Sequence, residues 1–312
     1  MILYKAVITP RTSFASPLQS DTLFGAFCWS YKYLYGDGML EALLQESIRN
    51  QEHGIIFSNA FPAGCLPLPM GVYDEGRTRY SAVGKADAKK AYQENKKYKK
   101  YSLVQRDAFI NIQRGSRSGY SGHLAGERTV QDETVHNMVS RSAGTVGRME
   151  ESGSLFVTGE YFVREDEAFD VYILSDLDRD VIEKVISLML ELGIGADKST
   201  GKGGFQLLSF DEERELGCVN DANGYMALSN FIPAQSDPME GWYKTFVKYG
   251  KLDREFAAGY FPFKKPLLYL QAGAVFKTDK VAACYGRYVE DISAVEGVVV
   301  NACTIAIPMK LP

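Results

Sequence analysis

In the first part of the chain, apolar and polar residues follow two patterns, one typical of a strand and one typical of a helix. Ile2 to Thr9 alternates as a strand does. A helix is predicted next, because Leu23, Phe27, Tyr31 and Leu34 recur at helical spacing. Its start falls on three residues whose side chains suit a helix N-cap, namely Ser20, Asp21 and Thr22. Met39 to Gln45 predicts a second short helix, and the three prolines of Phe57 to Met70 predict an extended loop.

A second group of elements is predicted between residues 154 and 210. Residues 154–174 indicate a hairpin, with strands at 155–163 and 169–174 joined by a charged turn. A helix follows over residues 177–192, with Ser175 and Asp178 at its start and Gly193 at its end. A strand over 205–210 completes the order strand, helix, hairpin, helix, strand, which is that of a ferredoxin-like βαββαβ unit.

The last third of the chain repeats this order in a degraded form. Strands are predicted at 225–231, 267–276 and 297–308, and a helix at 239–249. We therefore predict an α+β fold of two ferredoxin-like domains, residues 1–211 and 212–312. The first domain contains an insertion at about residues 76–135.

The loop from Gly193 to Gly204 is the most distinctive stretch of the sequence. It holds five glycines in twelve positions, and glycine alone reaches positive φ without a steric penalty. Backbone N–H groups turned toward one point form an anion nest, and Lys198 and Lys202 add positive charge. The order helix, loop, strand excludes a Walker loop and a dinucleotide fingerprint, which both follow a strand. The loop therefore indicates contact with a phosphodiester backbone.

Charge is distributed unevenly along the chain. The net charge is −4, yet residues 85–117 carry ten Lys and Arg against three Asp and Glu, so the rest of the chain is acidic. Tyr92, Tyr98 and Tyr101 lie among these lysines, a combination that fits single-stranded nucleic acid because every base has a face to stack. A solvated helix followed by a surface loop is the alternative interpretation of the same stretch.

Composition excludes several other classes of protein. No apolar run approaches a membrane span, and the chain begins directly with a strand pattern, so we expect a cytoplasmic protein that contacts no membrane. The five cysteines are never closely spaced, so no zinc site, redox site or cofactor is predicted. Asp176, Asp178 and Asp180 could suggest metal catalysis, but a helix start explains them, and no metal is predicted.

Three stretches together resemble the RAMP superfamily of CRISPR proteins and, within it, the fourth Csm subunit of type III-A effector complexes. They are Ser20 to Ala26, then His136-Asn137 with Arg141 and Gly144-Thr145, and the glycine loop. The resemblance implies a non-catalytic subunit that seats the 5′ tag of the guide RNA (crRNA). It implies as partners the large polymerase-like subunit, the first backbone RAMP subunit, and target RNA near the junction of tag and guide.

The resemblance and the residue patterns together give a set of candidate RNA-binding residues. They are Ser20, Asp21, Thr22, Arg114, Arg117, His123, His136, Asn137, Arg141, Gly193, Gly195, Lys198, Ser199, Thr200, Gly201, Lys202 and Gly203. A guide-processing endoribonuclease of the same superfamily is the alternative. It would need a general base beside the reacting 2′-hydroxyl, for which His136 is the first candidate and His123 the second.

Overall fold

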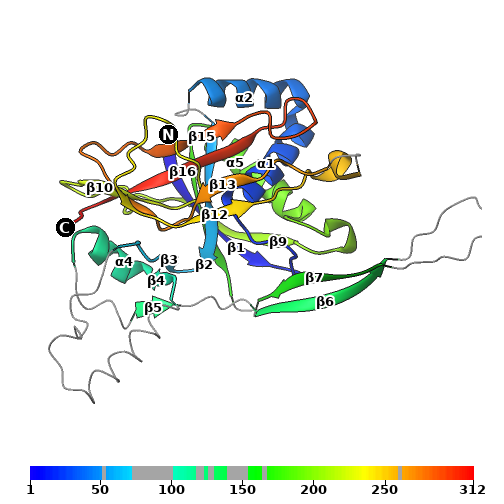
Figure 1. Cartoon of the computed structure of the whole chain (residues 1–312), viewed down its shortest axis with the longest axis horizontal. Coiled ribbons are helices and arrows are strands. Elements are labelled where there is room, and N and C mark those ends of the chain that lie inside the picture. The colour runs from blue at the N-terminus through cyan, green and yellow to red at the C-terminus, as the bar shows by residue number, and fades with distance from the viewer. Residues whose placement is uncertain are drawn as a thin grey trace, which may run out of the picture.

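The computed structural model describes residues 1–50, 54–71, 101–116, 123–125, 130–138, 154–163, 167–258 and 262–312. Figure 1 shows the described elements gathered around two antiparallel sheets. On one side lie α1 (Ser20–Tyr35), α2 (Asp37–Arg49) and α5 (Arg179–Leu192), and on the opposite side lies α4 (Arg106–Gln113), beside β3 (Cys65–Pro67) and β4 (Leu103–Gln105). Among these residues no helix combines the length and the apolar character needed to cross a bilayer. The predicted Lys- and Tyr-rich stretch, residues 85–101, lies almost entirely outside the described residues.

The first sheet has the strand order β2-β8-β1-β9, and all of its pairs are antiparallel. The strands are β1 (Ile2–Pro10), β2 (Ile55–Pro62), β8 (Phe169–Ser175) and β9 (Phe205–Glu212). Helices α1 (Ser20–Tyr35) and α5 (Arg179–Leu192) pack together against the sheet, and α2 (Asp37–Arg49) follows α1. Helices α1 and α5 each bury an apolar stripe, including Phe27, Ile182 and Val185, as amphipathic helices do.

Strand β2 differs from the prediction. The stretch 57–70, which was predicted to be an extended loop, contains most of β2 and all of β3 (Cys65–Pro67). The predicted hairpin over 154–174 is wrong, because its two strands do not pair with each other. Residues 169–175 pair with β1 and β2, whereas β7 (Ser154–Phe162) pairs with β6 (Val130–Met138). Along the chain, the strands of this sheet and helices α1 and α5 still follow the order β, α, β, β, α, β, with Ile55–Pro62 as the second strand.

The second sheet has the strand order β11-β14-β10-β16-β15. Its strands are β10 (Gly224–Ala227), β11 (Gly241–Trp242), β14 (Val275–Lys277), β15 (Cys284–Val289) and β16 (Val300–Met309). The helix predicted at 239–249 is wrong, because these residues form β11 and β12 (Thr245–Lys248). Within residues 212–258 and 262–312 the structure has only the short 3-10 helix η4 (Arg254–Ala258). The predicted strand at 267–276 is divided into β13 (Leu267–Leu270) and β14.

One buried core joins the two halves of the chain. Phe109, Tyr172 and Leu174 from the first half pack in the same cluster as Met226 and Ile305 from the second. This cluster also contains β4 (Leu103–Gln105) and α4 (Arg106–Gln113), which lie beside β3 and β5 (Leu124–Ala125). The halves therefore share apolar burial and are held together by it.

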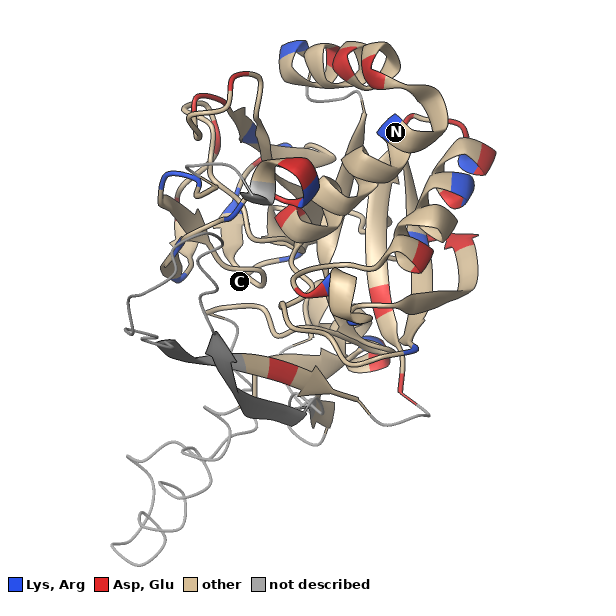
Figure 2. Ribbon diagram, turned by 90° about the vertical axis from the view of Figure 1, so that its right-hand side faces the viewer, with Lys and Arg blue, Asp and Glu red and all other residues tan. Residues whose placement is uncertain are grey.

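Strands β6 and β7 form a two-stranded arm that extends from the body of the molecule (Figure 1). The root of the arm is anchored by Tyr161, whose backbone exchanges two hydrogen bonds with Phe14 and whose ring stacks on that of Phe14 at 5.2 Å. Charged residues of both signs are interspersed along the described helices (Figure 2).

Candidate nucleic-acid interface

The glycine loop lies between α5 and β9 and contains the 3-10 helix η3 (Lys198–Thr200). Gly193, Gly195, Gly201 and Gly203 all have positive φ, between +76° and +90°. At Gly203 a Cβ atom would also lie 2.2 Å from the carbonyl oxygen of Ile194. The loop therefore requires glycine for its conformation and for its close packing.

Most N–H groups of this loop are directed to the protein and not to a common point. The amide of Gly203 donates to Ser13 O at 2.8 Å, and that of Ile194 donates to Gly203 O at 2.8 Å. The amides of Ala196 and Gly204 donate to the hydroxyls of Ser16 and Thr12. Those of Thr200, Gly201 and Lys202 donate to carbonyl groups of Asp197 and Lys198. Most N–H groups of the predicted nest are therefore used within the loop or to fasten it to residues 12–16.

Three backbone N–H groups at the start of η3 remain available to bind a ligand. The N–H groups of Asp197, Lys198 and Ser199 have no hydrogen-bond acceptor within the part of the chain that the structure describes. Asp197 has φ +59°, which turns the backbone at this point. Consecutive N–H groups of this kind can bind an anion. Ser199 and Thr200 are exposed beside them.

Both lysines of the loop are paired with carboxylates. Lys202 Nζ lies 3.0 Å from Glu160 Oε2 at the root of the arm, and Ser13 Oγ donates to the other oxygen of Glu160. Lys198 Nζ donates to Asp253. Glu160 is buried, so these two partners help to stabilise its charge. The lysines hold the loop to β7 and to the second half of the chain.

The start of α1 is also occupied by protein contacts. The N-cap is Gln19 and makes no side-chain capping bond, whereas Ser20 is buried. The amide of Ser20 donates to Asn59 Oδ1 at 3.1 Å, and its hydroxyl donates to Asn230 O at 3.3 Å. Asp21 Oδ1 accepts from Lys248 Nζ at 2.6 Å, and the amide of Thr22 donates to Gln19 O. The N-cap position predicted for Ser20 to Thr22 thus belongs to Gln19, and Ser20 and Asp21 also contact the second half of the chain through Asn230 and Lys248.

These contacts bring Lys198, which was predicted as a site residue, together with three cations that were not. We call the group the junction cluster; its members are Lys198, Lys248, Arg254 and Lys264 with Asp21 and Asp253. Lys198 and Lys248 are paired with Asp253 and Asp21, whereas Arg254 donates to Asp253 only through its backbone N–H group. Lys264 has no hydrogen-bond acceptor for its ammonium group among the described residues. Burial lowers the pKa of Lys264, and the nearby charge of Asp21 opposes this shift.

Aromatic residues of α1 and η4 border the junction cluster. The guanidinium of Arg254 lies 5.2 Å from the ring centre of Tyr33 and 5.8 Å from that of Trp29. Trp29 in turn lies 5.9 Å from Phe256. Tyr33 and Phe256 are exposed. Cations beside accessible rings are suited to single-stranded nucleic acid, which offers phosphates and base faces together.

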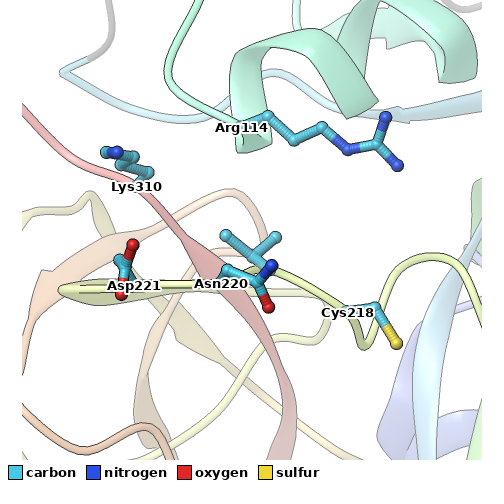
Figure 3. Close-up of a pocket in the computed structure, with 6 residues that line it drawn as sticks. Arg114, Cys218, Asn220, Asp221 and Lys310 are labelled. Carbon is cyan, nitrogen blue, oxygen red and sulfur yellow. The ribbon is translucent and has the colours of Figure 1, made fainter.

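The remaining candidate residues are distributed over other parts of the molecule. Arg114 ends α4, 3.6 Å from Glu215, and lines a groove together with Lys310, Cys218, Val219, Asn220 and Asp221. Figure 3 shows the guanidinium of Arg114 pointing away from Lys310, so the two cations do not converge on one ligand. His123 contacts Gln105 at 3.0 Å on the surface. Figure 1 shows α4 and β5 away from β9, and therefore away from the glycine loop.

The arm carries two further candidates. His136 and Asn137 lie on β6 opposite Phe156 and Leu155, toward the tip of the arm. Nothing is described of their side chains, and Arg117 and Arg141 lie outside the described residues. Within the described ranges, no group of three or more His, Cys, Asp or Glu residues is placed to hold a metal ion.

No protein-family model matches the sequence, and no curated protein matches it. Solved structures match over the whole chain. One is a chain of a Csm1-Csm4 cassette in complex with cA4, with a TM-score of 0.61, 18% identity and 99% of both chains covered. Another belongs to a Csm3-Csm4 subcomplex of the type III-A CRISPR-Cas interference complex, with a TM-score of 0.58, 17% identity and full coverage of both chains. Csm4 is named in both assemblies, so this chain shares its fold with chains of Csm4-containing assemblies, which agrees with the resemblance of its motifs.

Replacing Gly203 by Ala should destabilise the protein more than replacing Gly201. Both residues have positive φ, which costs a non-glycine residue about 1–3 kcal/mol. At Gly201 no atom lies within 4 Å of an added Cβ, whereas at Gly203 the Ile194 carbonyl must move. Urea denaturation of Gly203→Ala and the matched control Gly201→Ala measures the difference. Equal losses would contradict the close packing of Gly203.

Replacing Lys202 by Met should remove a cationic partner of buried Glu160. We expect a loss of about 2–4 kcal/mol in the free energy of unfolding, since a broken buried pair is costly. Lys277→Met is the matched control, because Lys277 pairs with exposed Glu240 and such pairs contribute about 1 kcal/mol or less. If Glu160→Gln fails to rescue Lys202→Met, the ion pair is not the cause of the loss.

Proposed function

We propose that this chain is a non-catalytic, RNA-binding subunit of a type III-A CRISPR effector complex, in which it seats the 5′ tag of the crRNA. The observation that carries the proposal is the likeness over the whole chain to chains of Csm1-Csm4 and Csm3-Csm4 assemblies. In this proposal residues 1–211 form a ferredoxin-like RAMP domain and residues 212–312 its C-terminal partner domain. The β, α, β, β, α, β order of the first sheet supports the first assignment.

The RNA backbone is proposed to lie along the start of η3 and the junction cluster. The open N–H groups of Asp197, Lys198 and Ser199 suit phosphate oxygens. Asp253 connects the two groups: it accepts from Lys198 Nζ and from the backbone N–H of Arg254, and its charge acts on Lys264. Such contacts carry no sequence information, which suits a subunit that must accept any guide behind a constant tag.

The β6–β7 arm is proposed to reach the junction of tag and guide, and there the target RNA. Its root contacts the glycine loop through Glu160 and Lys202. His136 lies opposite Phe156, four residues beyond Glu160 along β7, or about 13 Å farther from the root. The arm thus extends from the proposed tag site with His136 and Asn137 toward its tip. Arg141, Gly144 and Thr145 follow in the sequence.

The partners are proposed to be the large polymerase-like subunit and the first backbone RAMP subunit. The matched solved chains come from assemblies with Csm1 and with Csm3, which supports these two classes of partner. Since the described residues show one shared core between the halves, a single rigid body could contact both partners. Its role would be to bridge them at one end of the complex.

Replacing Lys264 by Met should weaken the binding of single-stranded RNA without breaking an ion pair. We expect about threefold to tenfold lower affinity, and a salt dependence of log K reduced by about 0.7 for each phosphate that is no longer neutralised. The measurement is fluorescence anisotropy of labelled single-stranded RNA over a salt series. The matched control is Lys280→Met, an exposed lysine with no ion-pair partner among the described residues. Unchanged affinity in Lys264→Met would remove the junction cluster from the RNA site.

The same samples discriminate a binding subunit from a guide-processing ribonuclease. The bound RNA should be recovered intact after incubation with repeat RNA, with and without divalent metal ions. Cleavage at a defined position that is abolished in His136→Ala would contradict a non-catalytic role and would support His136 as a general base.

A further inference from the structure

Strands β12 and β13 form a separate two-stranded ladder that is covered on only one side. Phe246 and Tyr269 are cross-strand partners whose rings stack at 5.7 Å on the inner face. The inner face also carries Lys248, which belongs to the junction cluster. Because successive side chains alternate between faces, the neighbouring residues of β12 project outward.

The outer face of this ladder is apolar and exposed. Val247 and Leu268 are directly opposite each other and are 50% and 58% exposed. Tyr249, two residues after Val247, is 77% exposed. Phe263, which is 67% exposed, pairs with Lys251 where the ladder continues as an isolated bridge. Contiguous exposed apolar side chains of this size mark an interaction surface more often than a free surface.

The charge around this outer face has one sign. Residues 245–251 and 263–270 contain four lysines and no Asp or Glu, although the whole chain carries −4. Lys248 and Lys264 belong to the junction cluster, whereas Lys251 and Lys265 are exposed. Neither Lys251 nor Lys265 has an ion-pair partner among the described residues. An apolar centre with unpaired lysines at its rim is complementary to an apolar surface flanked by carboxylates.

We propose that the outer face of β12 and β13, with Val247, Tyr249, Phe263 and Leu268 at its centre, is the docking surface for a neighbouring protein subunit that presents an apolar centre and an acidic rim. This inference rests on the proposed function, since it takes the partner from the same effector complex. Val247 and Leu268 favour protein over RNA, because aliphatic side chains offer no aromatic ring for a base to stack on. The cations that suit phosphate belong instead to the junction cluster.

The test measures binding of this chain to the purified large subunit and, separately, to the purified backbone subunit of its own effector complex. The variants are Val247→Glu/Leu268→Glu, which places charge in the apolar centre, and Lys251→Glu/Lys265→Glu, which reverses the rim. Leu208→Glu is the matched control, because Leu208 is equally exposed at 54% but lies on β9. Circular dichroism confirms that each variant is folded, and analytical ultracentrifugation and RNA anisotropy are run on the same samples.

We expect the first variant to weaken binding to one of the two subunits at least tenfold. We expect the second variant to slow association with the same subunit and to reduce its salt dependence, with Leu208→Glu within twofold of the unmodified chain. Unchanged binding of both variants overturns the docking surface and leaves the proposed function intact. Loss of self-association or of RNA affinity alone overturns it in favour of a second copy or RNA. If the unmodified chain binds neither subunit, the proposed function itself fails, and this inference with it.

Discussion

The buried polar contacts between the two sheets determine where every candidate surface lies. The side-chain amide of Asn301 on β16 donates to the backbone carbonyl of Ile55 at 2.9 Å, and the hydroxyl of Ser229 donates to that of Phe57 at 2.8 Å. Strand β2 is irregular between Phe57 and Ala60, so backbone groups there lack regular ladder partners. Buried backbone groups must be paired, and here the second half of the chain supplies the partners. The relative position of the two sheets is therefore fixed by directional bonds as well as by a shared core.

The polar contacts between the two halves of the chain continue at the start of α1. Asn59 accepts from the amide of Ser20, and Asn230 accepts from its hydroxyl, so the helix begins where the two halves meet. Lys248 then bonds Asp21 in the same turn. The consequence is that cations from residues 248–264 lie beside a glycine loop that ends more than forty residues earlier in the sequence. The glycine loop contributes its backbone conformation and the N–H groups of Asp197, Lys198 and Ser199. The ammonium group of Lys264, which has no ion-pair partner among the described residues, comes from the second half of the chain.

Helices α1 and α5 were well predicted from the sequence because their signals are local, whereas the helix predicted at 239–249 was wrong and α4 was missed. The apolar stripe of α5 and the capping role of Asp178, whose side chain accepts from the amide of Asp180, need no distant contact. Strand β2 was missed because Pro62 and Pro67 suggested a loop, although both lie at strand ends where a missing N–H is tolerated. The pairing of residues 169–175 with β1 could not be predicted, since strand partners are chosen by tertiary packing.

The predicted site shows the same division between local and distant information. Positive φ at Gly193, Gly195, Gly201 and Gly203 agrees with the expectation from glycine spacing. Whether the amides of such a loop face a ligand or the protein depends on Thr12, Ser13 and Ser16, which are close only after folding. Lys248 was not predicted, because the stretch 239–249 was predicted as a helix. In a helix, Phe246, Val247 and Lys248 would face different directions from those they have on strand β12. Lys264 carried no local signal at all.

One element connects the two proposed surfaces. Because side chains alternate along a strand, β12 places Lys248 on the junction cluster while Val247 faces outward. Across the ladder, Leu268 faces outward, whereas Tyr269 is buried on the inner face. A two-stranded ladder has few partners of its own and becomes more ordered when one face is covered. In the proposed complex, a protein subunit docked on the outer face would therefore hold the inner lysines in place. Docking of a protein and retention of RNA would then be coupled through a single pair of strands.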